Sequence, residues 1–254
     1  MCLASGVHAA CPPAEIDERV AVEYVHDGDT VRLADGRSLR LVGLDTPELA
    51  RDGRPDEPLA RTARDRLRDL VSEAGMRLEL DYDDERLDRY GRTLAHAYLA
   101  DGRSVTAQLL GEGLATALTV PPNLASWTCY RDAERAARDA GRGLWGLPGY
   151  RPLEARALDR ARRGFTLVRG LVTAVEPRRS GLRVVFEGRF VAWIPRDHLE
   201  YFPDLQALVG RRVEVRGHLR PYRDELQINV RHPAALAPIA AESDVPARRG
   251  PVSK

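Results

Sequence analysis

The spacing of apolar and polar positions changes near residue 165 and divides the chain into two regions. In the first region, apolar and β-branched residues occur in short runs, some alternating with polar residues, as in half-buried strands. The predicted strands are residues 20–25, 30–33, 39–44, 76–82 and 93–99. Turn signals, including Asp35-Gly36, separate the first three, so residues 20–44 predict a three-stranded meander.

Three helices are predicted among these strands. Their ranges are residues 60–74, 104–111 and 126–140. Apolar side chains recur at helical spacing in the first, which Gly75 ends, and Ser104 and Ser126 are suitable N-caps for the other two. Residues 114–120 predict a short apolar strand. The first region is therefore predicted to combine barrel-like strands with helices.

The second region has an all-β pattern. Its predicted strands are residues 167–175, 182–186, 190–194, 212–219 and 225–230. A short helix is expected within residues 195–208, after the third strand. Five strands with a helix in this position predict a small OB-like barrel. The fold class is therefore mainly β with α (α+β), with two barrels in one chain.

The pattern also predicts where the domains begin and end. The predicted segments are an N-terminal segment (1–19), a first domain (20–147), a charged helical linker (148–164), an OB-like β domain (165–236) and a tail (237–254). The tail is rich in Pro, Ala and Arg, which predicts disorder.

Charge is distributed unevenly along the 254 residues. The chain as a whole carries a formal net charge of +1, which indicates no class of partner. Residues 1–164 contain 24 arginines against 28 acidic residues, whereas residues 165–236 contain 12 arginines against 8 acidic residues. The positive excess therefore lies in the second region. The near absence of lysine is explained by codon bias and is not evidence of function.

The N-terminal sequence resembles the end of a secretory signal peptide. Small residues around 7–9 suit a cleavage site, although the basic start and most of the apolar core are missing, as if the start were assigned too far downstream. The alternative is a short disordered N-terminus. Cleavage would remove Cys2 and leave Cys11 and Cys129 as an even pair, so we predict an exported protein with a Cys11–Cys129 disulfide. Two unpaired thiols are the alternative.

Several carboxylates are placed as metal-assisted phosphodiester hydrolysis requires. Asp29 follows a glycine at a strand start, and Asp45 ends the neighbouring predicted strand, so one cation could reach both. Hard oxygen ligands suit Ca²⁺ or Mg²⁺. Glu48, three residues beyond Asp45, is close enough to hold an attacking water. Asp27 and Asp35, in Asp-Gly pairs, are interpreted as turn formers.

Two arginines are candidates for binding the phosphate. Arg92 follows Gly91 in a turn, and Arg40 lies on the strand that leads to Asp45. In a regular strand the odd spacing turns Arg40 and Asp45 to opposite faces, so a bulge or strand twist must bring them together.

Three motifs in order resemble the staphylococcal nuclease (thermonuclease) family. They are Asp27-Gly28-Asp29-Thr30-Val31, then residues 40–48 (Arg-Leu-Val-Gly-Leu-Asp-Thr-Pro-Glu), then Asp88-Arg89-Tyr90-Gly91-Arg92. The resemblance covers about residues 20–147. It implies an OB-type five-stranded barrel with three helices and a Ca²⁺-dependent endonuclease of DNA or RNA that leaves 3′-phosphorylated products. Ca²⁺ is favoured over Mg²⁺ on the same basis.

The resemblance also implies a role for individual residues. Asp29 and Asp45 would bind Ca²⁺ through their side chains and Thr46 through its backbone carbonyl. Glu48 would act as general base or orient the water.

Four further residues are assigned to the substrate by the same resemblance. Arg40 and Arg92 would bind the scissile phosphate, and Arg92 could assist the leaving 5′-oxygen. Arg89 and Tyr90 match positions that contact a terminal phosphate in the family.

The sequence departs from the family in two respects. Thr119 and Pro121 stand where a family member has two tyrosines against the base, and the first region is net acidic. Since phosphate neutralisation dominates non-specific affinity, this region alone is expected to bind polynucleotide weakly. The basic second region is a candidate for supplying that affinity, or else a structural or protein-binding appendage.

Two functions from different classes follow from these observations. The first is a secreted Ca²⁺-dependent nuclease acting on DNA or RNA. The second is a binding protein for nucleic acid or protein that has the nuclease fold without the activity. Such proteins usually lack the catalytic carboxylates and arginines. The retention of all five candidate residues favours the enzyme.

Overall fold

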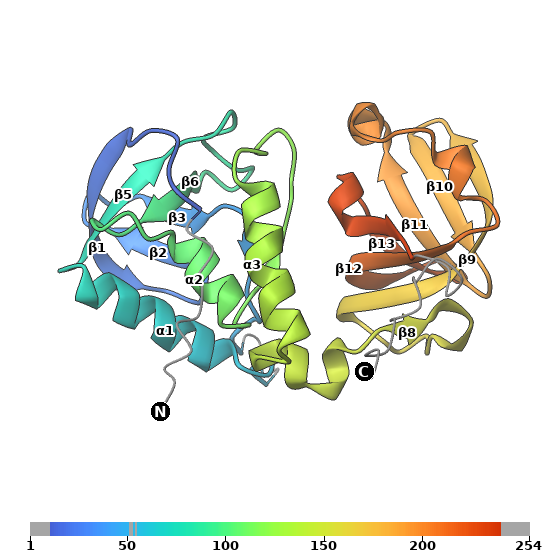
Figure 1. The fold of residues 1–254 in the computed structure, drawn as a ribbon, viewed down its shortest axis with the longest axis horizontal. Helices are drawn as coiled ribbons and strands as arrows, with labels where there is room; N and C mark the ends of the chain where they lie inside the picture. Colours follow the sequence, from blue (N-terminus) through green and yellow to red (C-terminus); the bar gives the residue numbers. More distant parts are fainter. Residues whose placement is uncertain (1–10, 51–52, 54, 240–254) are drawn as a thin grey trace, which may run out of the picture. The chain divides into compact units, whose positions relative to one another are not determined.

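The chain divides into two compact units, residues 1–148 (unit 1) and residues 149–254 (unit 2) (Figure 1). The computed structural model describes residues 11–50, 53 and 55–239. Most of the predicted signal-peptide segment and the tail from residue 240 lie outside the described residues. Each unit is described separately below.

Unit 1 is built around a closed five-stranded barrel with the order β1-β2-β3-β6-β5. The strands are β1 (Glu18–Val25), β2 (Thr30–Leu33), β3 (Ser38–Leu41), β5 (Arg77–Asp81) and β6 (Thr93–Tyr98). The β3–β6 pair is parallel and the other four pairs are antiparallel. Apolar side chains alternate along these strands, and those facing inward, such as Leu33 and Leu39, are fully buried. This confirms the predicted barrel.

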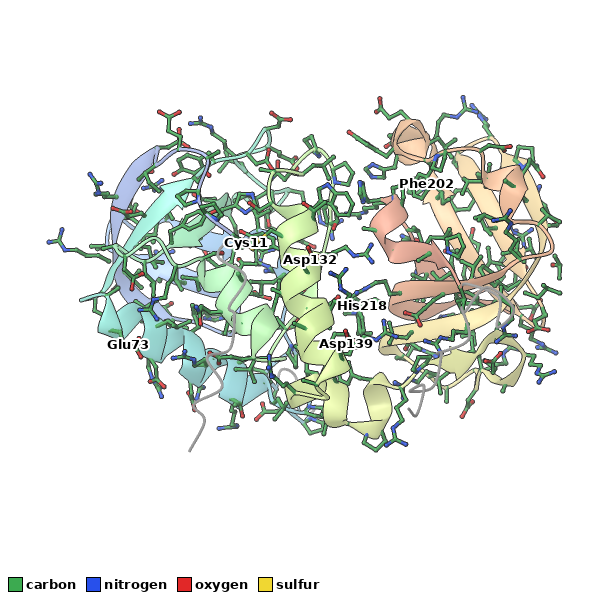
Figure 2. All side chains as sticks on the ribbon, in the orientation of Figure 1. Cys11, Glu73, Asp132, Asp139, Phe202 and His218 are labelled. Carbon is green, nitrogen blue, oxygen red and sulfur yellow. A yellow bond between two sulfur atoms is a disulfide. The ribbon has the colours of Figure 1, made fainter. Side chains whose placement is uncertain are left out.

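The described residues of unit 1 include three α-helices. They are α1 (Ala60–Glu73), α2 (Val105–Gly111) and α3 (Trp127–Asp139); Glu73 and Asp139, which end the first and third, are labelled in Figure 2. The predicted apolar face of α1 is buried in the core. The predicted N-cap Ser104 accepts a hydrogen bond from the Ala107 amide. A 3₁₀ turn, η1 (Gly143–Gly146), follows α3.

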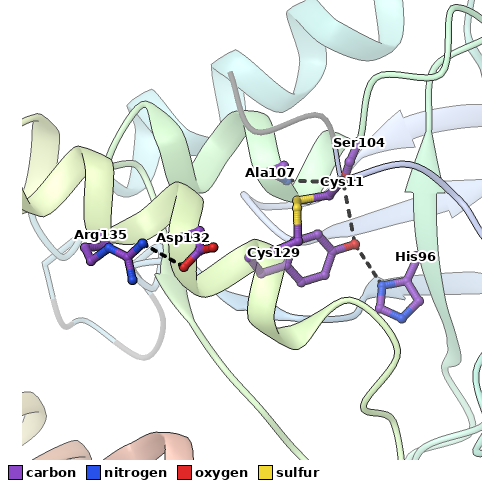
Figure 3. The surroundings of a disulfide bond; sticks show 8 residues. Cys11, His96, Ser104, Ala107, Cys129, Asp132 and Arg135 are labelled. Carbon is purple, nitrogen blue, oxygen red and sulfur yellow. Dashed lines mark hydrogen bonds and ion pairs between the residues drawn. A yellow bond between two sulfur atoms is a disulfide. The ribbon is translucent and has the colours of Figure 1, made fainter. Parts of the chain in front are cut away.

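A disulfide joins Cys11 to Cys129 on α3 (Figure 3). Its Cα atoms are 5.6 Å apart, and Cys11 is buried in the core of unit 1. Beside it, the Tyr130 hydroxyl lies 2.8 Å from Nδ1 of His96, another buried side chain. The disulfide therefore ties the segment before the barrel to α3.

Unit 2 contains a longer sheet with the order β14-β12-β13-β11-β10-β9-β8 and an additional β12–β9 pairing. The strands are β8 (Leu153–Glu154), β9 (Gly164–Arg178), β10 (Gly181–Phe186), β11 (Phe190–Pro195), β12 (Arg212–Tyr222), β13 (Glu225–Asn229) and β14 (Leu236–Pro238). Short 3₁₀ helices complete the unit: η2 (Pro148–Tyr150, across the boundary), η3 (Ala155–Ala157), η4 (Arg196–Tyr201), η5 (Leu205–Leu208) and η6 (Pro233–Ala235).

The strand pairings of unit 2 repeat those of unit 1. The β12–β9 pairing closes the circuit β9-β10-β11-β13-β12, in which β11–β13 is parallel and the other pairs are antiparallel. The third strand pairs in parallel with the fifth in both units, and helical turns follow the third strand in both. The pairing order agrees with the small OB-like barrel predicted for this region.

Three segments differ from the predicted elements. Residues 39–44 form β3 and the two-residue β4 (Leu44–Asp45), because a turn interrupts the strand. Residues 114–120 contain only β7 (Thr116–Ala117), which pairs with β4. Residues 148–164, expected to be a helical linker, contain η2, β8 and η3, and β8 pairs with β9. In addition, β14 pairs with β12 and extends the second sheet past residue 236.

Candidate active site

The turn between β1 and β2 holds Asp29 against Thr46. A Cβ atom at Gly28 would lie 2.8 Å from the Thr46 side chain and 2.9 Å from Cβ of Ala63, so glycine is required for this close approach. Asp29 Oδ2 accepts hydrogen bonds from the backbone amide (3.2 Å) and the hydroxyl (3.0 Å) of Thr46. The Asp29 carboxylate is thereby fixed and buried at the barrel wall.

A second turn returns the chain so that Asp45 lies beside Arg40. Gly43 has φ of +89°, and a Cβ atom there would lie 2.3 Å from the Tyr130 ring. The turn ends β3 before the chain resumes as β4. Arg40 and Asp45 therefore do not belong to one regular strand, which removes the difficulty that their odd spacing posed.

Arg40 brings the two aspartates together. Its Nη2 atom lies 3.0 Å from Oδ2 of Asp29 and 3.1 Å from Oδ1 of Asp45. Its Nη1 atom donates to the backbone carbonyls of Leu41 (3.0 Å) and Leu44 (3.1 Å). The side chain is only 13% exposed, so the guanidinium is held on four sides in a partly desolvated position. We call these three residues the Asp29–Arg40–Asp45 cluster.

The pKa of the Asp29 carboxylate in the cluster is perturbed. Burial raises the pKa of Asp29 to about 6, opposed by the positive charge of Arg40 and reinforced by the negative charges of Asp27 and Asp45. The positive charge of Arg40 therefore does not fully offset the cost of burying the Asp29 carboxylate near two other aspartates. A cation with a higher charge would stabilise the ionised form further.

The donor set of the cluster fits a hard divalent cation. Asp29 and Asp45 converge on one cationic nitrogen, and carboxylate oxygens bind Ca²⁺ at about 2.3–2.6 Å. Among the described residues no group of three or more His, Cys, Asp or Glu side chains could hold a metal. A cation here would therefore need backbone carbonyl or water ligands as well, as the expected role of the Thr46 carbonyl supposes.

Glu48 lies at the surface just beyond Thr46. Its backbone amide donates to the Glu57 carboxylate (3.0 Å), and its carbonyl accepts from the Glu57 amide (2.9 Å). These two bonds hold the backbone at Glu48 while the residue itself is exposed. The carboxylate is accessible to solvent, as a group that holds a water must be.

Arg92 is positioned by the loop that precedes β6. Asp88 accepts from the Arg92 amide (2.9 Å) and from Nε (2.7 Å), while the guanidinium lies 5.7 Å from the Tyr90 ring. Arg89 lies over the same ring at 4.7 Å and donates to its hydroxyl (2.6 Å). Arg89 and Tyr90 are exposed. The loop therefore presents two guanidinium groups around one tyrosine.

A shallow cavity of about 290 Å³ connects Arg92 with the β1–β2 turn. Asp27 lines it from that turn, Thr30 and Arg32 line it from β2, and Ser38 lines it from β3. Asp27 is buried and its carboxylate accepts from the Asp29 amide (3.2 Å), as expected of a turn former. Its place in the cavity and its effect on Asp29 were not predicted, since an Asp-Gly pair looks the same in any turn.

The structure thus groups the predicted residues into three places. Asp29, Arg40, Asp45 and Thr46 form one contact cluster. Arg92 lines the cavity that Asp27 also lines. Glu48 and the pair Arg89 and Tyr90 are exposed on the loops after β4 and before β6. Chemically, the cluster offers oxygen ligands for a cation and the loop offers guanidinium groups for an anion.

Comparison with known proteins gives one consistent result. The family model described as "Staphylococcal nuclease homologue" matches residues 38–146. The chain is 35% identical over 131 residues to the thermonuclease of Staphylococcus intermedius, covering 50% of this chain and 76% of that protein. It is 35% identical over 135 residues to Endonuclease YncB of Bacillus subtilis, covering 52% of this chain and 63% of that protein.

A second group of relatives is fungal. The probable endonuclease lcl3 of Aspergillus flavus is 36% identical over 130 residues, which cover 45% of this chain and 44% of that protein. The family model begins after Asp29, and it ends within unit 1. Unit 2 lies outside the matched residues.

Proposed function

The chain belongs to the staphylococcal nuclease family and is a nuclease, and we propose that it is a Ca²⁺-dependent endonuclease that hydrolyses DNA or RNA to 3′-phosphorylated products. The observation that carries this proposal is the Asp29–Arg40–Asp45 cluster. Two carboxylates and one guanidinium meet within 3.1 Å at the wall of the barrel. A metal site and a phosphate site would share this position.

In the proposed mechanism Asp29, Asp45 and the Thr46 carbonyl would hold Ca²⁺. The bound cation would neutralise charge on the phosphodiester as the transition state forms. Thr46 has a second role, because its amide and hydroxyl both donate to Asp29 and fix the direction of that carboxylate. The two bonds pre-organise the ligand, which lowers the cost of assembling the site.

Glu48 and the two arginines act on the reacting groups. Glu48 accepts a proton from the attacking water, whose oxygen bonds to phosphorus as the bond to the 5′-oxygen breaks. Arg40 and Arg92 stabilise the extra negative charge of the pentavalent phosphorus. Arg92 donates a hydrogen bond to the 5′-oxygen, which leaves as it takes up a proton from solvent. Losing one such donor typically costs about 10²–10³ in rate.

The substrate and location follow from the same assignment. Arg89 and Tyr90, both exposed on the loop before β6, would contact a terminal phosphate. The Cys11–Cys129 disulfide supports an extracytoplasmic site of action, because disulfides persist in oxidising compartments. No helix among the described residues has the length and apolarity needed to cross a membrane.

The test is digestion of plasmid and single-stranded DNA and of RNA with Ca²⁺, with Mg²⁺ and with EDTA. Wild-type protein should cut in Ca²⁺ and fail in EDTA. Glu48→Gln and Arg92→Ala should each lose about 100-fold or more. Product ends should carry 3′-phosphate and 5′-hydroxyl.

Matched controls are available within unit 1. Arg103 donates hydrogen bonds to the Asp101 carboxylate through its amide (3.1 Å) and its Nε (2.7 Å), as Arg92 does to Asp88. Arg103 does not line the cavity. Arg103→Ala and Glu73→Gln should keep wild-type activity. Cleavage that persists in EDTA, or that survives both Glu48→Gln and Arg92→Ala, would refute the proposal and favour a protein that binds without cutting.

A further inference from the structure

Unit 2 contains a cavity of about 560 Å³ whose lining combines arginines with aromatic side chains. The lining includes Arg178, Arg183, Trp193, Arg220, Tyr222 and Arg223. These six residues come from four strands, β9 to β12, and from the turn between β12 and β13. Two carboxylates, Asp224 and Glu225, also line the cavity, and Arg178 pairs with Glu176.

The lining residues share one outer face of the second barrel. Along β10 and β11 the side chains of Val184 and Ile194 point into the core, so Arg183 and Trp193 point outward. The two outward residues are direct cross-strand partners. Arg220 pairs with Gln227 on the neighbouring strands, which extends the same face. The residues that line the cavity therefore form one continuous patch on the outer face of the sheet.

The arginines of this face are unequally neutralised. Arg183 is held by two carboxylates, Glu176 and Glu225. Arg220 instead donates to two neutral amide oxygens, those of Gln227 and Asn229, both at 3.1 Å. Hydrogen bonds to neutral oxygens leave the charge of the guanidinium in place. Arg220 therefore offers a positive charge on a surface that is already organised.

Arg223 adds a second such charge beside an aromatic ring. Its guanidinium lies 5.4 Å from the centroid of the Tyr222 ring. Tyr222 is 46% exposed, so part of its ring remains accessible to a planar ligand. Trp193 is fixed from below, because a Cβ atom at Gly181 would lie 2.7 Å from its indole. Rings that are fixed and accessible can stack on bases, and adjacent guanidinium groups can contact the phosphates between them.

This cavity lies beside the same two strand connections as the cavity that Arg92 lines in unit 1. In unit 1 the cavity is bounded by Asp27 in the turn between the first two barrel strands and by Arg92 in the loop before the fifth. In unit 2 the corresponding turns contribute Ser180 and Arg223. Barrels with this strand order bind oligonucleotides on this face and with these loops. The two cavities thus share the connection between the first two strands and the connection before the fifth strand.

We propose that this face of unit 2 binds a single-stranded stretch of polynucleotide, with Trp193 and Tyr222 stacking on bases and Arg220 and Arg223 contacting phosphates. The candidate catalytic carboxylates are absent from the face, so it binds without cutting. It would supply affinity that the net acidic first region lacks. The inference does not depend on the proposed nuclease activity, because binding can be measured with cleavage prevented.

The test measures binding of a fluorescein-labelled 12-nucleotide oligo(dT) to the full chain by anisotropy, in EDTA, over a range of salt concentrations. The double variant Arg220→Ala/Arg223→Ala should reduce affinity at least tenfold. It should also reduce the slope of log K against log salt by about 1.4, which corresponds to two lost phosphate contacts on a single strand. Tyr222→Ala should weaken binding about fivefold or more through lost stacking.

The control removes two charges elsewhere in unit 2. Arg189 and Arg211 are exposed and lie outside the cavity lining. The double variant Arg189→Ala/Arg211→Ala should therefore keep its affinity within twofold of the wild-type affinity. Its slope of log K against log salt should stay within about 0.3 of the wild-type slope. Far-UV circular dichroism and melting establish that each variant is folded. Any of three results would overturn the inference: the wild-type protein binds no oligo(dT), the cavity variants bind as the control does, or a duplex of equal length binds more tightly. The last two results would indicate general charge attraction or a different partner.

Discussion

Removing the Cys11–Cys129 disulfide should destabilise unit 1 by several kcal/mol. The bond joins residues 118 positions apart, and Cys11 is buried in the core of the unit. In the chain-entropy account, closing a loop of this size stabilises the folded state by about 5 kcal/mol, and measured values for native disulfides are about 2–5 kcal/mol. The double variant Cys11→Ala/Cys129→Ala changes little else, because alanine keeps each Cβ atom.

The assay is urea unfolding followed by tryptophan fluorescence. Replacing Trp193 by Phe leaves Trp127 and Trp145, both in unit 1, so the signal reports that unit alone. Replacing Cys2 by Ala in every protein compared removes the third thiol. With a urea slope of about 2 kcal/mol/M, a loss of about 4 kcal/mol lowers the midpoint by about 2 M.

Reduction provides the matched control for this prediction. A reducing agent should lower the midpoint of the disulfide-containing protein to that of the alanine variant and leave the variant unchanged. A difference below about 1 kcal/mol between oxidised protein and variant would contradict the reasoning. So would a reducing agent that shifts both proteins equally.

Three further predictions concern unit 1. Gly43→Ala should lower the free energy of unfolding by about 2 kcal/mol or more and reduce activity, because the new Cβ atom meets the Tyr130 ring. The control Gly102→Ala has a similar positive φ but open space around it, so it should cost about 1 kcal/mol. Equal urea midpoints for the two variants would contradict this prediction. Glu134→Ala should lower the free energy of unfolding by about 1–3 kcal/mol, since the buried Glu134 carboxylate accepts a 2.6 Å hydrogen bond from the Ala117 amide. An unfolding free energy equal to that of the wild type would contradict this prediction. Ca²⁺ at 100 times its dissociation constant should stabilise unit 1 by about 2.7 kcal/mol in thermal unfolding, reversed by EDTA; a midpoint independent of Ca²⁺ would count against the metal site.

The sequence pattern predicted the barrel of unit 1 because alternation and turn signals are local. The apolar positions of α1 and the N-cap Ser104 were predicted for the same reason. The break between β3 and β4 was not predicted. Val42 and Leu44 continue the apolar run, and the requirement for glycine at position 43 comes from Tyr130, which is distant in sequence. Long-range packing of this kind has no local signal.

The candidate site shows the same division. Motif spacing pointed to Asp29, Arg40 and Asp45, but their contact depends on two turns that only the folded chain defines. The role of Asp27 in the cavity was missed because turn-forming and site-lining aspartates have identical sequence context. In unit 2, β8 and β14 are too short to produce a detectable period, and they form because a neighbouring strand offers unpaired backbone groups.

The central claim is that the Asp29–Arg40–Asp45 cluster is the metal site of a nuclease. The most direct measurement is the Ca²⁺ concentration that gives half-maximal cleavage of single-stranded DNA by Asp45→Asn, compared with Asp101→Asn as a control outside the site. Losing a partner of a metal ligand typically costs about 10–100-fold in metal affinity, and losing the ligand itself should cost at least as much. The half-activating Ca²⁺ concentration of Asp45→Asn should therefore rise by at least this factor, while Asp101→Asn keeps the wild-type value. An unchanged half-activating concentration for Asp45→Asn would contradict the account.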